Sequence, residues 1–178
     1  MTVARNVFVA AVCMLLVLPA SAREQSLEQW FDAELVPAVS DRLQNHPRFK
    51  GQTVMFVVID GNEPASVSNA LALSLRDRLL NAALDTGNIR VAWRQGSAAN
   101  SIGDADCRRD TVNYYIGVEI AEQLDRRYEI RVRAMDLDDG SWVGGFGSTW
   151  RGTLNGLEQR ALRDRAADAS FLGARNVP

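Results

Sequence analysis

The sequence is poor in the side chains on which most enzymes and metal sites depend. It has one histidine, His46, one lysine, Lys50, and two cysteines, Cys13 and Cys107. A zinc site draws on several histidine or cysteine ligands, and catalysis of the Ser-His-Asp type needs a histidine as base. His46 falls where a helix is expected to end, and neither it nor Lys50 stands beside a nucleophile motif. We therefore expect no catalytic residue, no metal and no cofactor.

An excess of positive charge is also absent. The chain has 20 basic and 22 acidic residues, which gives a net charge of −2. This balance does not favour nucleic acid as a partner. All the basic residues except Lys50 are arginines, which indicates a codon bias, so an arginine is not by itself a recognition residue.

Residues 1–22 have the composition of a secretory signal peptide. Arg5 is followed by the apolar run "VFVAAVCMLLVLPA" and by Ala20-Ser21-Ala22, which places small residues before a cleavage point near Ala22-Arg23. The alternative is an uncleaved anchor, although a membrane span requires about 20 apolar residues. Cys13 lies inside the apolar run, which disfavours lipidation. The chain is thus expected in the periplasm or outside the cell, and peripheral to a membrane at most.

Export leaves Cys107, in "DADCRRD", as the only thiol of the mature chain. Neighbouring arginines favour its thiolate and neighbouring aspartates oppose it. It either pairs with another molecule or is an incidental loop cysteine.

Hydrophobic periodicity predicts one helical segment followed by a mixed sheet. Apolar residues recur at helical spacing from Leu27 to Leu43, with Pro37 expected to kink or divide the helix and Pro47 to end it. Residues 53–59 are continuously apolar, as in a strand covered on both faces, and residues 67–85 form a second helical pattern. Strands are expected at 89–93, 112–121, 128–134 and about 142–150, a surface loop at 95–110, and a weaker helix at about 155–170.

The predicted order is therefore α-β-α-β-loop-β-β-β-α. It corresponds to an α/β (α+β) fold with a single mixed sheet of about five strands and helices mainly on one face. We divide the chain into a signal peptide (1–22), an N-terminal helical segment (23–50) and an α/β domain (51–178).

Two motifs have simple structural interpretations. The "DLDDG" sequence (136–140) lacks the distal glutamate of a calcium loop and matches a tight turn. The glycines of "GGFGSTWRG" lie inside a strand pattern, so they favour a bulge over a phosphate loop. The sequence also leaves open the possibility that two carboxylates form a site for glycoside cleavage. The candidates are Asp60, Glu63, Glu119 and Glu122.

Two stretches resemble a domain of the bacterial envelope. They are "GQTVMFVVIDGNEPASVSNALALSLRDRLLNAALDTGNIRVAW" and "VNYYIGVEIAEQLDRRYEIRVRAMDLDDGSWVGGFGSTWRG". They are similar to the two halves of the domain shared by the penicillin-binding-protein activator LpoB, the curli secretion lipoprotein CsgG and the TolB N-terminal domain. In the second half, the matching positions are 115–118, 135–140 and Trp142. The resemblance implies a non-catalytic adaptor or regulator that binds an envelope protein or a peptidoglycan-associated partner.

Strand parity predicts an interaction surface on the face without helices. Since side chains alternate along a strand, Arg131 and Arg133 should lie opposite Ile130 and Val132. The same parity gives the full set, which is Arg90, Arg94, Tyr115, Arg131, Arg133, Gly145, Gly147 and Arg151, with Gly117 beside them. Alternatively, Glu119 and Glu129 pair with these arginines on a solvated face of no special function.

Two function classes remain open. The first is an exported non-catalytic adaptor or regulator of the cell envelope. The alternative is an exported hydrolase acting on envelope glycans.

Overall fold

The structure, a computed structural model, describes residues 25–85, 90–92 and 112–167. The predicted signal peptide, the predicted loop at 95–110, Arg94 and Cys107 lie outside these residues. Within them, no helix has the length and apolar character that crossing a membrane requires.

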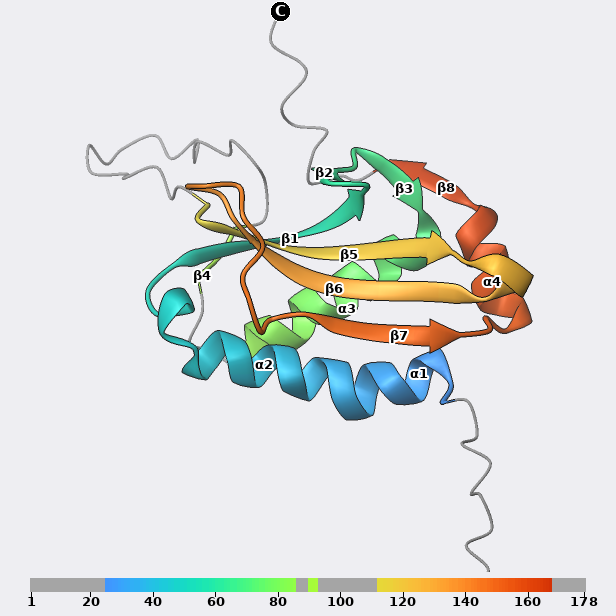
Figure 1. Cartoon of the computed structure of the whole chain (residues 1–178), viewed down its shortest axis with the longest axis horizontal. Helices are drawn as coiled ribbons and strands as arrows, with labels where there is room; N and C mark the ends of the chain where they lie inside the picture. The colour runs from blue at the N-terminus through green and yellow to red at the C-terminus, as the bar shows by residue number, and fades with distance from the viewer. Residues whose placement is uncertain (1–24, 86–89, 93–111, 168–178) are drawn as a thin grey trace, which may run out of the picture.

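The described chain folds into one mixed sheet with helices packed on one of its faces (Figure 1). The six-stranded sheet has the order β2-β1-β5-β6-β7. The sixth strand, β4, pairs with the same edge of β1 as β2 does. Its strands are β1 (Thr53–Asp60), β2 (Glu63–Pro64), β4 (Arg90–Val91), β5 (Tyr114–Glu122), β6 (Tyr128–Asp136) and β7 (Ser148–Gly152). β1 runs parallel to β4 and β5, and the other pairs are antiparallel. The predicted α+β fold with a mixed sheet is confirmed.

The N-terminal helix is divided next to its proline, as expected. It consists of α1 (Leu27–Trp30), a π-helical turn η1 (Phe31–Leu35) and α2 (Val36–Asn45), followed by the short η2 (Pro47–Phe49). Pro37 has no N–H to donate, and its ring would clash with the carbonyl one turn earlier. The wider π turn directly before α2 accommodates the proline. His46 ends α2, and its Nδ1 accepts a hydrogen bond from the Arg48 N–H at 3.3 Å, which is a capping role.

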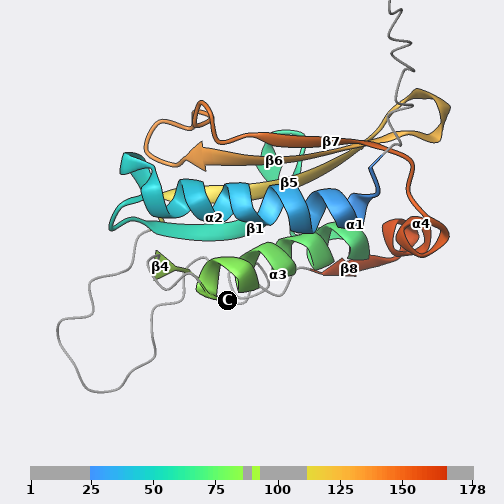
Figure 2. The same cartoon turned by 90° about the horizontal axis from the view of Figure 1, so that it is seen from below.

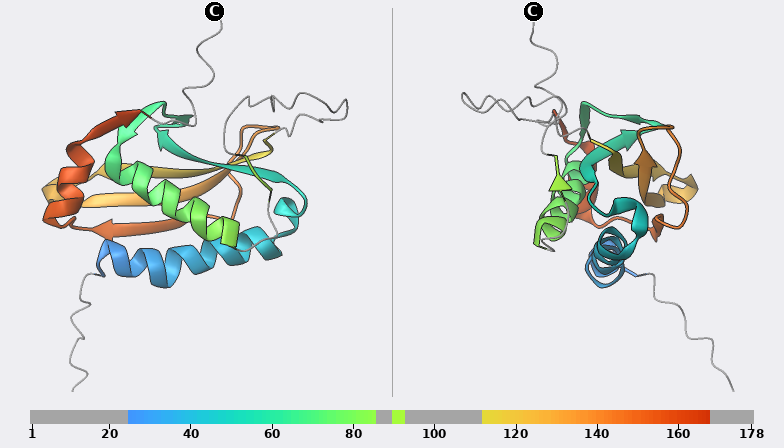
Figure 3. Two further views of the ribbon diagram at one scale, coloured as in Figure 1. Left: turned by 180° about the vertical axis from the view of Figure 1, so that it is seen from behind. Right: turned by 90° about the vertical axis from the view of Figure 1, so that its left-hand side faces the viewer.

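The main core lies between the sheet and the helices α1, α2 and α3 (Ala70–Asp85), which Figures 2 and 3 show on the same side of the sheet. The apolar stripe of the N-terminal helix contributes Trp30, Phe31 and Leu35 to this core. Ile130, Val132 and Ala134 of β6 join it and are at most 1% exposed. Residues 53–59 are all buried, so the prediction of a strand covered on both faces is correct.

Both predicted helices of the α/β part are shorter than expected, because residues at one end of each form strands of a small second sheet. β3 (Val67–Asn69) pairs antiparallel with β8 (Arg165–Ala167). The first helix therefore begins at Ala70 instead of Val67. The last helix, α4 (Gly156–Arg163), ends at Arg163 instead of continuing to about residue 170.

The expected strand at 142–150 is also partly wrong. Trp142 forms an isolated bridge with Met135, and β7 begins only at Ser148. A turn at Gly144–Gly145 separates them, with Gly145 in the left-handed region at φ +76°. This turn interrupts the alternation that a continuous strand would have, so Trp142 lies on the opposite face of the sheet from Phe146 and Trp150.

Candidate functional site

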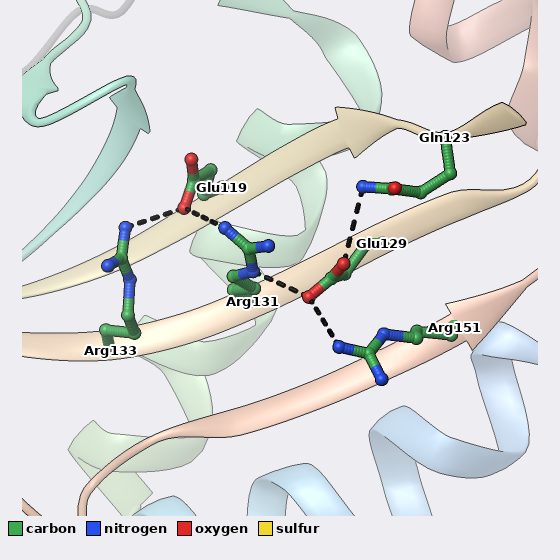
Figure 4. Close-up of polar contacts among 6 residues, drawn as sticks. All are labelled: Glu119, Gln123, Glu129, Arg131, Arg133 and Arg151. Carbon is green, nitrogen blue, oxygen red and sulfur yellow. Dashed lines mark hydrogen bonds and ion pairs between the residues drawn. The ribbon is translucent and has the colours of Figure 1, made fainter.

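The candidate site is the part of the sheet surface that faces away from the helices, over β5, β6 and β7. We call it the arginine face and define it by six residues (Figure 4). They are Glu119, Gln123, Glu129, Arg131, Arg133 and Arg151. They come together because antiparallel register sets Glu119 opposite Arg131 and Glu129 opposite Arg151, and paired residues project to the same side.

Glu129 is the anchor of this face. It is only 5% exposed, yet it accepts three hydrogen bonds. Arg131 Nε donates to Oε1 at 2.7 Å, Arg151 Nη2 to the same oxygen at 3.3 Å, and Gln123 Nε2 to Oε2 at 3.3 Å. The bonds from Arg131 and Arg151 hold the pKa of Glu129 below its ordinary value, although burial acts in the opposite direction.

Glu119 holds the other end of the arginine face. Arg133 Nη2 lies 2.7 Å from Glu119 Oε2, and Arg131 Nη1 lies 3.8 Å from the same oxygen. The guanidinium of Arg133 also stacks on Trp142, 3.7 Å from the ring centroid. Such stacking favours a fixed, weakly hydrated guanidinium.

These contacts orient the three arginines without neutralising the face. Three guanidinium groups meet two carboxylates, and each guanidinium has five N–H donors. The side chain of Arg151 is 69% exposed, that of Arg131 36% and that of Arg133 27%. Donors thus remain on the solvent side for a carboxylate or another anionic group.

The structure brings together only part of the predicted interaction surface. Arg131, Arg133 and Arg151 lie as expected. Arg90 is exposed on β4, but two strands, β1 and β5, separate it from β6. The glutamates of the alternative interpretation do pair with the arginines, so pairing and exposure coexist on this face.

Tyr115 shares the parity of the arginine face but is not accessible. It is 5% exposed and belongs to a second apolar cluster with Met55, Val57 and Ile59, which contains no residue of a described helix. Burial raises the pKa of its phenol. The expectation that Tyr115 forms part of an open surface is wrong, because this end of the face is covered.

The glycines of the predicted surface do not open the arginine face to an approaching strand either, although Gly117 pairs with Arg133 and shares its side of the sheet. Gly145 occupies the turn described above. Gly147 is exposed, and its carbonyl accepts a hydrogen bond from Arg42 of α2 at 3.2 Å. Gly117 lies under Ile59, whose side chain fills the place of a Cβ atom. Gly145 thus forms a turn and Gly117 allows close packing of Ile59. Because Ile59 covers Gly117, an approaching strand cannot contact the backbone there.

Sequence reasoning missed Gln123 and Trp142 as members or neighbours of this site. The hairpin register that pairs Met135 with Trp142 could have placed the tryptophan beside Arg133. Gln123 lies at the end of β5, where no periodic signal identifies its direction.

A cleft lies at the end of the sheet towards β3 and β8. Its volume is about 260 Å³, and residues from β1, β5, β6 and α4 line it together with those two strands. Of the four carboxylates considered from the sequence, Asp60 and Glu122 line the cleft, Glu119 is ion-paired on the arginine face, and Glu63 is exposed on β2. Among the described residues, no group of three or more His, Cys, Asp or Glu side chains could hold a metal ion.

A comparison with protein-family models found no match, and a comparison with curated protein sequences found none either. Among solved structures, the chain is similar to the LpoB C-terminal domain from Salmonella enterica. The match has a TM-score of 0.42 and 14% identity, over 69% of this chain and 98% of that one. This similarity by itself assigns neither a partner nor an activity to this chain.

Proposed function

We propose that the protein is an exported, non-catalytic adaptor or regulator of the cell envelope, and that it binds its partner through the arginine face. The partner is an envelope protein or a cell-wall component that presents carboxylates. The observation that carries this proposal is the pre-orientation of Arg131, Arg133 and Arg151 by Glu119 and Glu129 on a face without helices.

Pre-orientation matters because ordering flexible side chains opposes binding. Immobilising a rotamer-rich side chain at an interface costs about 0.5–1.5 kcal/mol. Arg131 and Arg133 have already lost this freedom through their ion pairs and through the stacking of Arg133 on Trp142. An anionic partner can therefore form bidentate hydrogen bonds without that loss.

The test is site-specific photo-crosslinking in living cells. A photoreactive residue at Thr149 faces the same side as Arg131, with which it pairs, and is expected to capture a partner that mass spectrometry then names. The same residue at Leu84, which is half-exposed on α3, is the matched control and should capture nothing comparable. Equal capture at the two positions would contradict the proposal.

A double variant tests whether the arginines themselves bind. Replacing Arg131 and Arg133 with serine should lower capture at Thr149 at least about tenfold, because hydrogen bonds to charged groups contribute about 1.5–3 kcal/mol. The control is the equivalent double variant of Arg160 and Arg163 on α4, which should leave capture unchanged. Undiminished capture by a folded Arg131/Arg133 variant would show that these arginines do not bind the partner.

One observation favours the second candidate function, an exported hydrolase acting on envelope glycans. Asp60 and Glu122 both line the cleft, and glycoside cleavage uses two carboxylates that flank the bond. If this function holds, purified protein releases reducing sugar ends from peptidoglycan, and Asp60→Asn abolishes the release. The adaptor proposal expects no release from either protein.

A further inference from the structure

The cleft has a position that α/β folds use for ligands. β1 and β5 are adjacent and parallel, and the cleft lies at their carboxyl ends, at Val58–Asp60 and at Ile120 and Glu122. β2 and β4 pair with one edge of β1 and β5 with the other. The chain leaves the carboxyl end of β1 towards β2 and β4 on one side, and it leaves the carboxyl end of β5 towards β6 on the other side. Such a switch point opens a crevice outside the carboxyl ends of the strands.

Residues of the β3–β8 ribbon and of α4 line the other sides of this crevice. Figure 1 shows these elements beside the carboxyl ends of β1 and β5. Asn69 and Arg165, a residue pair of the ribbon, contribute to the lining, and Leu162 of α4 adds an apolar wall. The volume of about 260 Å³ is just below the range of about 300–1,000 Å³ typical of small-molecule pockets. This volume suits a small ligand of about the size of a dipeptide.

The charges around the cleft differ in sign from one side to the other. Asp60 and Glu122 end the two parallel strands and supply two carboxylates. Arg165 lies on the ribbon side, where α3 also begins. Asn69 and Ala72 at this end both line the cleft, where Asn69 Oδ1 accepts a hydrogen bond from the Ala72 N–H at 2.8 Å and the Asp164 carbonyl accepts one from the Ala70 N–H at 2.8 Å. These N–H groups are therefore engaged, and the dipole of α3 is what this end of the helix contributes towards an anion.

From this arrangement we infer that the cleft binds a small zwitterion, namely a free amino acid or a dipeptide. The ammonium group lies towards Asp60 and Glu122, and the carboxylate lies towards Arg165 and the first turn of α3. Apolar side chains such as Ile120 and Leu162 contact the aliphatic part. This site is separate from the arginine face, and it stands or falls independently of the adaptor function.

The probe is the dipeptide alanyl-alanine, titrated into the isotope-labelled chain and followed by amide NMR shifts. Saturable shifts are expected at residues that line the cleft, such as Asn69 and Tyr128, and not on the arginine face. Two derivatives remove one charge each without touching the protein. They are N-acetyl-alanyl-alanine, which lacks the ammonium, and alanyl-alanine amide, which lacks the carboxylate. Each should bind about fivefold more weakly, because one ion pair accessible to water is worth up to about 1 kcal/mol.

Protein variants then identify the partner of each charge. Asp60→Asn should weaken the dipeptide about fivefold and leave the affinity for the N-acetyl derivative unchanged, since that ligand has no ammonium to lose. Arg165→Gln should likewise weaken binding of the dipeptide about fivefold and leave the affinity for alanyl-alanine amide unchanged, since that ligand has no carboxylate. Glu63→Gln, which removes a carboxylate next to Asp60 but outside the lining, and Arg160→Gln on α4 are the matched controls and should change nothing.

Three results would overturn the inference. The first is the absence of saturable shifts with millimolar dipeptide. The second is equal affinity for the dipeptide and both derivatives, which would show that the cleft does not recognise the two charges of the ligand. The third is saturable binding of an N-acetylglucosamine oligosaccharide in place of the dipeptide, which would assign the cleft to glycans.

Discussion

At the scale of single residues, Glu129 is the most buried member of the arginine face. Glu129 is almost fully buried, and its charge is compensated only by the donors that surround it. Removing one partner of a buried hydrogen-bonded group leaves the others without compensation, which costs more than the bond itself contributes. Glu129 thus orients both Arg131 and Arg151 and links the ends of neighbouring strands.

The first prediction concerns the pH dependence of stability. Because the folded state holds the pKa of Glu129 below 4.5, the ionised carboxylate adds stability above that pH. This contribution disappears as the pH falls through the lowered pKa of the folded state. We expect Glu129→Gln to lower the free energy of unfolding by about 1–3 kcal/mol at neutral pH. The difference from the unchanged chain should shrink as acidification passes through the lowered pKa of Glu129.

Urea denaturation at several pH values measures this difference. Glu34→Gln, at an exposed position of the N-terminal helix, is the control and should cost little at any pH. A difference for Glu129→Gln that stays constant down to the acid limit would show that the ion pairs add no stability.

A second residue-scale prediction concerns Gly117, in the middle of β5. A Cβ atom there would lie 1.9 Å from Ile59 Cδ1 and 2.6 Å from Cγ1. Ile59 is buried and has little room to move. We expect Gly117→Ala to lower the free energy of unfolding by about 1–3 kcal/mol. Adding Ile59→Val, which deletes Cδ1, should recover part of this loss, as a double-mutant cycle by chemical denaturation can show. Strictly additive effects would mean that the two side chains do not collide.

At the scale of elements, one distant strand pairing and one turn explain where the helix and strand predictions failed. The pairing of β3 with β8 removed residues from the ends of two predicted helices. The turn at Gly144–Gly145 moved Trp142 to the arginine face. Pairing between segments almost 100 residues apart leaves no periodic signal in either segment, so local pattern reasoning assigned both to helices.

The element-scale prediction compares two glycines of the connection between β6 and β7. Gly145 has a φ of +76°, whereas Gly147 has no such angle, and a Cβ atom at either position meets nothing within 4 Å. Gly145→Ala should therefore destabilise the protein by about 1 kcal/mol through the backbone alone. Gly147→Ala should be nearly neutral. Thermal denaturation of the two variants measures the contrast, and equal melting temperatures would contradict the assigned turn.

At the scale of the whole molecule, the N-terminal helix is part of the main core. Trp30, Phe31, Leu35, Val39 and Leu43 are each at most 2% exposed and pack in the same cluster as the sheet. The Trp150 indole also donates a hydrogen bond to the Gln25 carbonyl at 2.9 Å. Fully burying a large apolar side chain contributes about 1.5–3 kcal/mol. These five side chains together match the net stability of about 5–15 kcal/mol of a typical domain.

We therefore predict that a chain without residues 1–50 loses its cooperative thermal transition. Circular dichroism during heating should show a gradual change and no sigmoidal step. A chain lacking only residues 1–22, which we expect to be removed on export, is the control and should unfold cooperatively. A cooperative transition of the shorter chain at an unchanged temperature would mean that the helical segment is not part of the folding unit.

The sequence by itself determined the order of the main elements, the faces of β1 and β6, and the side on which Arg131, Arg133 and Arg151 lie. These features follow from local periodicity, because alternation along a strand sorts side chains whatever the rest of the fold does. Only the tertiary structure decided the burial of Tyr115 and Glu129, the contact of Trp142 with Arg133, the β3–β8 ribbon and the cleft between Asp60 and Arg165. Each of these depends on which distant segments become neighbours, and that is settled by packing and strand register across the whole chain.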